Sequence, residues 1–109
     1  MVEYTIDLDS VFASLADPTR RDILRRVSRQ QLSVGEIARP YGLTFAAVSK
    51  HLKVLERARL IVKQKRGKEH VVHIAPQTLK SADDYLQFYR QLWESRLDSL
   101  ESYLKESEK

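Results

Sequence analysis

The spacing of hydrophobic side chains in the first third of the chain predicts two helices. The first is expected over about residues 8–15. Asp17-Pro18 then ends it and starts the second, because Asp caps helix N-termini well and Pro at the first helical position gives up a donor that would be unpaired anyway. The two apolar stripes consist of Val11, Phe12 and Leu15, and of Ile23, Leu24 and Val27. The side chains expected to point outward are Arg20, Arg21, Arg25 and Arg26.

A short helix, a tight turn and a longer helix are predicted next. The segment SVGE at 33–36 fits the capping-box pattern, in which the Ser hydroxyl and the Glu carboxylate each accept from the other residue's backbone N–H. This helix is expected to end near residues 38–39, because Pro40 and Gly42 resist its continuation. Thr44 is expected to cap the longer helix, which runs to about residue 58. Its core side holds Val48, Leu52 and Leu55, and its opposite side holds Ala46, Lys50, Lys53 and Arg57, with Ser49 at the edge.

The last part of the chain is expected to form a hairpin and a long helix. Strands are predicted at Leu60–Gln64 and His70–Ile74, joined by the loop Lys65–Glu69, in which Gly67 supplies the turn. Pro76 is expected to end the second strand. An amphipathic helix follows, from about residue 78 or 81 to 105. Its nearly heptad stripe consists of Leu79, Ala82, Leu86, Tyr89, Trp93, Leu100 and Tyr103, broadened by Tyr85, Leu97 and Leu104.

These elements predict a mainly α (α+β) fold, a winged helix-turn-helix with a two-stranded β-hairpin wing and a long C-terminal dimerisation helix. A chain of 109 residues suits one domain, residues 1–109. Apolar content of 42% and charged content of 31% suit a soluble globular protein, and no apolar run approaches the roughly 20 residues that span a bilayer. The N-terminus MVEYTIDLDS has no basic region followed by an apolar one, so no secretory signal is expected there.

Positive charge is concentrated in the middle of the chain. The net charge is 0 over residues 1–43, +6 over residues 44–75 and −2 over residues 76–109. Such a basic segment is typical of a phosphate-binding surface, although a solvated charged face is the plain alternative. There are no cysteines, which excludes disulfides, thiolate metal sites and thiol redox switches.

The order of these parts favours sequence-specific binding to double-stranded DNA. The small side chain of Ala46 suits contact with a thymine methyl group, Ser49 can bond to a base or a phosphate, and Lys50 and Lys53 can reach guanine or phosphates. The hairpin tip is expected to lie over the DNA backbone or minor groove, with Arg66 best suited to a narrow groove. The predicted DNA-binding residues are Thr44, Phe45, Ala46, Ser49, Lys50, Lys53, Lys65, Arg66 and Lys68.

Residues 10–75 resemble the winged helix-turn-helix repressors of the arsenic-repressor type. The resemblance is carried by LADPTRRDIL at 15–24, LSVGEIA at 32–38, LTFAAVSKHLKVLERARLI at 43–61 and VKQKRGKEHVVHI at 62–74. YLQFYRQLWESRLDSLESYL at 85–104 is similar to one branch of that family. The resemblance implies an obligate-type homodimer, paired through its first and last helices, that binds a palindromic operator and usually represses its own operon. A cytoplasmic location is also expected.

Several residues depart from the family's pattern. Metal-sensing members carry two Cys where this chain has Ser33 and Gly35, and the Asp and His site of the last helix is reduced here to Asp83 and Asp84. No metal and no cofactor are therefore expected. Phe45 stands where many members carry a Gln that contacts DNA, so the base contacts at this position are expected to differ.

The amphipathic ends of the chain are expected to pair two copies, through about residues 8–16 and 79–105, because so broad an apolar face on a small domain signals association. The predicted dimer interface consists of Phe12, Leu15, Leu86, Tyr89, Trp93, Leu97 and Leu100. Two alternatives stay open. One is a winged-helix module that binds an acidic protein partner, and the other is a repressor that senses a small apolar ligand at the aromatic residues of the last helix.

No enzymatic role is expected. The chain has no Gly-rich phosphate loop, no nucleophile motif and no paired carboxylates in a plausible pocket. His51 is interpreted as a packing or phosphate-contacting residue rather than a metal ligand. His70 and His73 are not expected to bind a metal, because no nearby Cys or acidic cluster supplies the further ligands.

Overall fold

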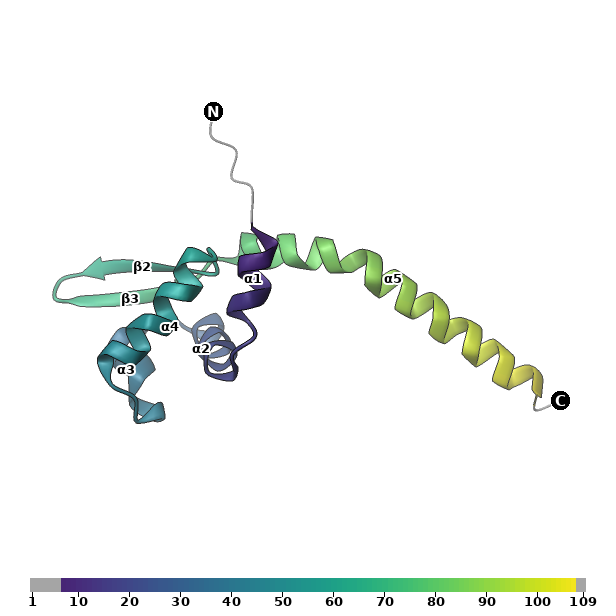
Figure 1. Ribbon diagram of the computed structural model, residues 1–109, viewed down its shortest axis with the longest axis horizontal. Coiled ribbons are helices and arrows are strands. Elements are labelled where there is room, and N and C mark those ends of the chain that lie inside the picture. Colours follow the sequence, from purple (N-terminus) through teal and green to yellow (C-terminus); the bar gives the residue numbers. More distant parts are fainter. Residues whose placement is uncertain (1–6, 108–109) are drawn as a thin grey trace, which may run out of the picture. The chain divides into compact units, whose positions relative to one another are not determined.

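The computed structural model describes residues 7–107 and separates into two compact units, Met1–Leu79 and Lys80–Lys109. No secretory signal was expected in residues 1–10, and most of that segment lies outside the described residues. The second unit is a stretch of one helix without a core of its own, so the expectation of a single domain stays a prediction. The first unit carries all the other elements (Figure 1).

The order of elements follows the prediction closely. The helices are α1 Leu8–Ser14, α2 Pro18–Arg29, α3 Val34–Ala38, the short 3₁₀-helix η1 Arg39–Tyr41, α4 Phe45–Arg57 and α5 Pro76–Ser107. The strands are β1 Leu32–Ser33, β2 Ile61–Arg66 and β3 Glu69–Ile74. Among these helices, none is long and apolar enough to cross a membrane.

The predicted helix caps are confirmed. The Asp17 carboxylate accepts from the backbone N–H of Arg20 at 3.1 Å, directly before Pro18. Ser33 and Glu36 form the complete capping box, with backbone to side-chain bonds of 3.1 and 3.2 Å. Because each cap satisfies N–H groups that a helix leaves unpaired, these residues define where α2 and α3 begin.

The sheet has three strands rather than the two expected, in the order β1-β3-β2, and all pairs are antiparallel. The strand that was not predicted is β1, which pairs Leu32 with Val72 and Ser33 with Val71. The hairpin loop is also shorter than predicted. Arg66 pairs with Glu69, so only Gly67 and Lys68 form the turn, and Gly67 adopts the left-handed conformation (φ +62°) that a two-residue hairpin loop requires.

The start of the long helix was predicted wrongly. Pro76 does not merely end β3 but is the first residue of α5, which begins before the expected Thr78 and continues to Ser107. Proline suits the first helical position because its fixed φ is already helical and its missing N–H has no helical partner there. The Thr78 hydroxyl donates to the carbonyl oxygen of Arg59 at 2.5 Å, which anchors this first turn to the end of α4.

One hydrophobic core holds the first unit together. Its fully buried side chains come from α1, α2, α3, α4, the sheet and the segment between α4 and β2, and the largest are Val11, Ile23, Ile37, Val48, Leu52, Leu55, Leu60, Ile61 and Val72. The stripe predicted for α4 is therefore confirmed as core. The prediction that four arginines of α2 point outward is wrong for two of them. Arg20 and Arg26 are half-buried and donate hydrogen bonds to backbone carbonyls of α1 and α3, which pin these helices to α2.

Candidate nucleic-acid interface

The turn between α3 and α4 sets the direction of the longer helix. After η1, Gly42 takes the left-handed conformation (φ +62°), and the extended backbone of Thr44 leads into α4. The Thr44 hydroxyl accepts from the backbone N–H of Ala47 at 3.1 Å. The first turn of α4 is thereby held in a fixed conformation at the surface of the unit. We call α4 the reader helix, because it carries most of the predicted DNA-binding residues.

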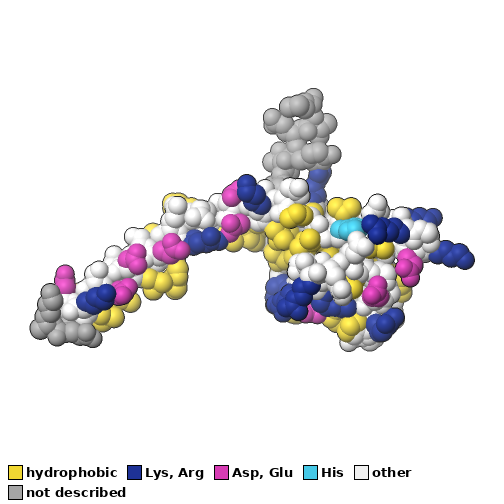
Figure 2. Space-filling model, turned by 180° about the vertical axis from the view of Figure 1, so that it is seen from behind, with side chains coloured by type: hydrophobic (Ala, Val, Ile, Leu, Met, Phe, Trp, Pro, Cys, Tyr) yellow, Lys and Arg dark blue, Asp and Glu magenta, His cyan; other side chains and the backbone are white. Residues whose placement is uncertain are grey.

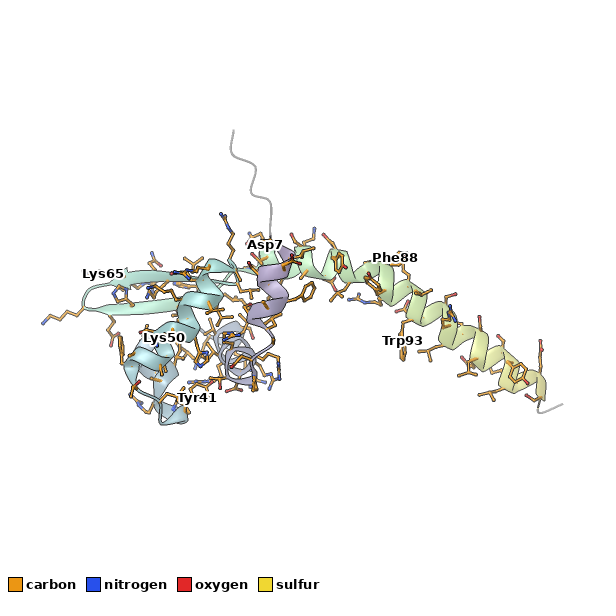
Figure 3. All side chains as sticks on the ribbon, in the orientation of Figure 1. Asp7, Tyr41, Lys50, Lys65, Phe88 and Trp93 are labelled. Carbon is orange, nitrogen blue, oxygen red and sulfur yellow. The ribbon has the colours of Figure 1, made fainter. Side chains whose placement is uncertain are left out.

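Side chains on the outer face of α4 are free to reach a partner. Phe45, Ala46, Lys50 and Lys53 are exposed, and Ser49 is half-buried. Figure 3 shows Lys50 on α4, the helix that lies beside the hairpin. Because the opposite side of α4 is buried in the core, the helix cannot rotate, and the predicted DNA-contacting side chains are held outward.

A network of three residues fastens the turn to α2. The Tyr41 hydroxyl donates to the Asp22 carboxylate at 2.5 Å, and the Arg26 guanidinium lies 5.3 Å from the centre of the Tyr41 ring. The same guanidinium donates 2.9 Å bonds to the carbonyl oxygens of Glu36 and Ile37, at the end of α3. Burial and, after it, the bond to Asp22 raise the pKa of Tyr41 above its usual value. The sequence prediction included none of these residues as part of the site.

Basic side chains cover the wing formed by β2 and β3. Lys63, Lys65, Arg66 and Lys68 are all exposed. Figure 2 shows Lys and Arg side chains gathered at the end of the wing, and Figure 3 shows Lys65 on it. Glu69 is the acidic residue of the wing. The wing therefore presents a positively charged surface beside the reader helix, which suits contacts with phosphates.

The first turn of α4 and the wing tip share one hollow with the start of α3. The hollow has a volume of about 180 Å³ and is lined by Ser33, Val34, Gly35, Phe45, Lys68, Glu69 and His70. Phe45 and Lys68 were both predicted as site residues. Their closeness was not predicted, because it depends on how β1 pairs with β3 and brings the wing beside α3.

The residues predicted for the dimer interface on α5 are exposed. From Asp83 to Ser107 every residue of the helix is exposed, including Leu86, Tyr89, Trp93, Leu97 and Leu100. Hydrophobic side chains line one edge of this helix in Figure 2. On α1, Phe12 is exposed and Leu15 is half-buried. The predicted interface residues are thus accessible in a single copy, while the pairing itself stays a prediction.

The aromatic residues of α5 lie against one another. Tyr85 and Tyr89 have ring centres 5.6 Å apart, and Phe88 meets Tyr89 edge to face at 5.3 Å. The hydroxyls of Tyr85 and Tyr89 are 3.4 Å apart. All three of these rings are exposed on one helix.

The expectation of no metal site stays a prediction. Within residues 7–107, no group of three or more His, Asp or Glu side chains is placed to hold a metal ion. Nε2 of His73 is buried without a hydrogen-bond partner.

Comparisons with known proteins agree with this geometry. Residues 15–64 match a family model described as a helix-turn-helix domain. The HTH-type transcriptional regulator Rv2034 of Mycobacterium tuberculosis is 43% identical over 68 residues, which are 62% of this chain and 64% of the relative. The match thus spans less than two thirds of that relative's length. The transcriptional repressor SdpR of Bacillus subtilis is 32% identical over 60 residues, 55% of this chain and 67% of the relative.

Among solved structures, this chain is similar to the ArsR family transcriptional regulator RHA00566. The TM-score is 0.75 at 34% identity, over 87% of this chain and 98% of that one. All three relatives are regulators of transcription, which confirms the predicted class of function. Since the likeness extends over nearly the whole of a solved family member, the chain belongs to the ArsR family of winged helix-turn-helix transcriptional regulators.

Proposed function

We propose that the protein is a homodimeric repressor that binds a palindromic operator in duplex DNA through α4 and the wing. The observation that carries this proposal is the arrangement within the first unit. An outward face with Ala46, Ser49, Lys50 and Lys53 lies beside a wing with four exposed basic side chains. An α-helix fits the major groove, and a basic hairpin beside it fits the flanking backbone or minor groove. The name of SdpR, a repressor, supports repression rather than activation.

Pairing of two copies is supported by the exposed helix α5. An isolated helix in water is only marginally stable, and most helices in proteins depend on packing of an apolar face. Within the described residues, every side chain of α5 from Asp83 to Ser107 is exposed, including those of its apolar face. A second copy of the same helix would bury it, and two-fold symmetry would present two reader helices to two half-sites. Such a regulator would act in the cytoplasm, and it needs no metal.

A protein-binding module is the alternative to a DNA-binding regulator. It would use the same basic surface to bind an acidic partner. The outward face of the reader helix favours DNA as the partner. It combines a small side chain, which allows close approach to the major groove, with polar and basic side chains that can bond to bases or phosphates.

The decisive experiment is selection of duplexes from a random pool, followed by titration of the selected duplex at several salt concentrations. We expect a two-fold symmetric preferred sequence. The logarithm of the affinity should fall linearly with the logarithm of the salt concentration, with a slope set by the number of phosphates contacted. A matched titration with a scrambled duplex measures non-specific binding. Equal affinity for both duplexes would overturn the proposal, and preferential binding to an acidic polypeptide would favour the alternative.

A further inference from the structure

We infer that Phe45 reads the 5-methyl group of a thymine in each half-site. This inference rests on the proposed DNA binding and adds to it the chemical group that one residue recognises. Its starting observation is an exposed aromatic ring at an unusual place. The side chain of Phe45 is 64% exposed, although it belongs to the unit that contains the hydrophobic core.

The backbone holds this ring at the leading end of the reader helix. Phe45 is the first residue of α4, directly after the capping residue Thr44, whose side chain bonds to the N–H of Ala47. In helix-turn-helix proteins the N-terminal residues of the reader helix are the ones that contact base edges. A fixed first turn gives the ring a fixed direction, so that it can distinguish one base pair from another.

The surroundings of the ring also favour contact with DNA. Phe45 forms a wall of the hollow of about 180 Å³ that Lys68 also lines, from the turn of the wing. An ammonium group is suited to a phosphate, and the neighbouring ring is suited to an apolar group on the base edges. A side chain that binds the backbone at this point would fix the register of the ring on the bases.

The chemistry of the ring selects its target. A phenyl group carries no hydrogen-bond donor or acceptor, so it cannot read the polar pattern of guanine, cytosine or adenine. The methyl group of thymine is the apolar feature of the major groove, and apolar side chains including Phe contact it. Ala46 follows directly and presents a second small apolar surface on the outer face of α4.

The test combines protein variants with a change of one methyl group in the DNA. A duplex selected with the wild-type protein is resynthesised with deoxyuridine in place of thymine, one symmetric pair of positions at a time. Deoxyuridine keeps the base pairing and removes only the methyl group. At the position that Phe45 reads, the wild-type protein should lose affinity by about fourfold per half-site, the effect of one buried methyl-sized group.

The variants show whether Phe45 is responsible for this dependence. Phe45→Ala should weaken binding to the thymine duplex and lose the difference between thymine and deoxyuridine at that position. Phe45→Leu keeps an apolar side chain and should keep part of the difference. Val62→Ala is the control, because Val62 is also an exposed apolar side chain (53%) but lies on β2, outside the predicted DNA-binding residues and the predicted dimer interface. It should retain the full dependence on the methyl group.

Each result bears on the inference separately from the proposed function. If selection yields no preferred sequence, both fail. If a preferred sequence is found but no thymine position loses affinity on conversion to deoxyuridine, only the inference is overturned. The inference is also overturned, and the proposed function is not, if replacing thymine with deoxyuridine weakens binding of Phe45→Ala as much as binding of the wild-type protein. Loss of the dependence in Phe45→Ala alone supports the inference.

Discussion

The hydroxyl of Tyr41 donates a hydrogen bond of 2.5 Å to the carboxylate of Asp22, and this bond joins the helix-turn-helix turn to α2. The two residues are 19 positions apart in the sequence. Tyr41 ends η1, directly before the left-handed Gly42, so the bond holds the point where the chain changes direction toward the reader helix. The orientation of α4 therefore depends on a polar contact as well as on its buried face.

Replacing Tyr41 with Phe should lower the free energy of unfolding by about 1–2 kcal/mol, because a hydrogen bond to a charged group is lost and the carboxylate of Asp22 loses its partner. Urea unfolding followed by circular dichroism measures the change. Tyr103→Phe is the control, since Tyr103 is an exposed tyrosine on α5. Equal stability of Tyr41→Phe and the wild-type protein would show that the bond contributes nothing.

Helix caps should make the protein less stable in acid. The backbone N–H of Arg20 lowers the pKa of Asp17, and bonds to Ser33 lower the pKa of Glu36. A carboxyl group whose pKa is lower in the folded state stabilises the fold above its unfolded pKa, and this stabilisation is lost as the pH falls through the folded pKa. Stability should therefore fall as the pH drops below the unfolded values of 4.5 for Glu36 and 3.8 for Asp17.

The double variant Asp17→Asn and Glu36→Gln isolates this effect, because amide oxygens still accept hydrogen bonds but do not titrate in this range. Its unfolding free energy should depend less on pH between about 5 and 2 than that of the wild-type protein. Glu94→Gln, on α5, serves as the control. An unchanged acid dependence in the double variant would contradict the proposed role of the caps.

Arg59 adopts a left-handed conformation (φ +62°) that favours glycine. It follows the last turn of α4, where the N–H groups of Arg59 and Leu60 donate 3.0 Å bonds to the carbonyls of Glu56 and Leu55. This is the Schellman pattern, which usually ends in Gly. The free energy of unfolding of Arg59→Gly should exceed that of Arg59→Ala by roughly 0.5–1 kcal/mol, because Gly adopts the left-handed conformation without steric cost. Both variants lack the Arg side chain, so their comparison isolates the effect of the backbone. Thermal unfolding measures the difference, and a more stable Ala variant would contradict it.

The sequence predicted the elements whose signals are local. Asp17-Pro18, the Ser33 and Glu36 capping box, and Thr44 each act within three residues, so their roles follow from spacing alone. The strand β1 was missed because Leu32 and Ser33 form only two residues of strand, and their partners on β3 are far along the chain. Pro76 was misread because proline both ends strands and begins helices, and only the structure distinguishes these.

Within the candidate site, side chains on an exposed helical face were predictable and the network behind it was not. Lys50 and Lys53 follow from the helical period. Arg26 looked like another surface charge in α2. Its partners are the carbonyls of Glu36 and Ile37, and the place of these atoms depends on how α2 and α3 pack. Backbone acceptors at the end of another helix leave no pattern in the sequence.

Lys50 and Arg66 should differ in how they affect DNA binding. Lys50→Ala should relax the preference for the selected duplex, because it removes a side chain that can reach base edges. Arg66→Ala should weaken selected and scrambled duplexes alike and lower the salt slope by about one unit for each wing that contacts DNA. Fluorescence anisotropy at several salt concentrations measures both effects. A salt slope that is unchanged in Arg66→Ala would count against contact by the wing.

If two copies associate through α5, a single charged side chain introduced on the apolar face of this helix should disrupt the dimer. Trp93 is exposed on this face, and burial of such a side chain contributes about 1.5–3 kcal/mol or more per copy. Trp93→Glu should therefore shift the protein toward the monomer and weaken operator binding, since one copy contacts only one half-site. Ser95→Glu adds the same charge at another exposed position of α5 and should remain a dimer. Light scattering after size exclusion measures the mass. A wild-type protein that is monomeric at micromolar concentration, or a Trp93→Glu variant that stays dimeric, would contradict pairing through this face.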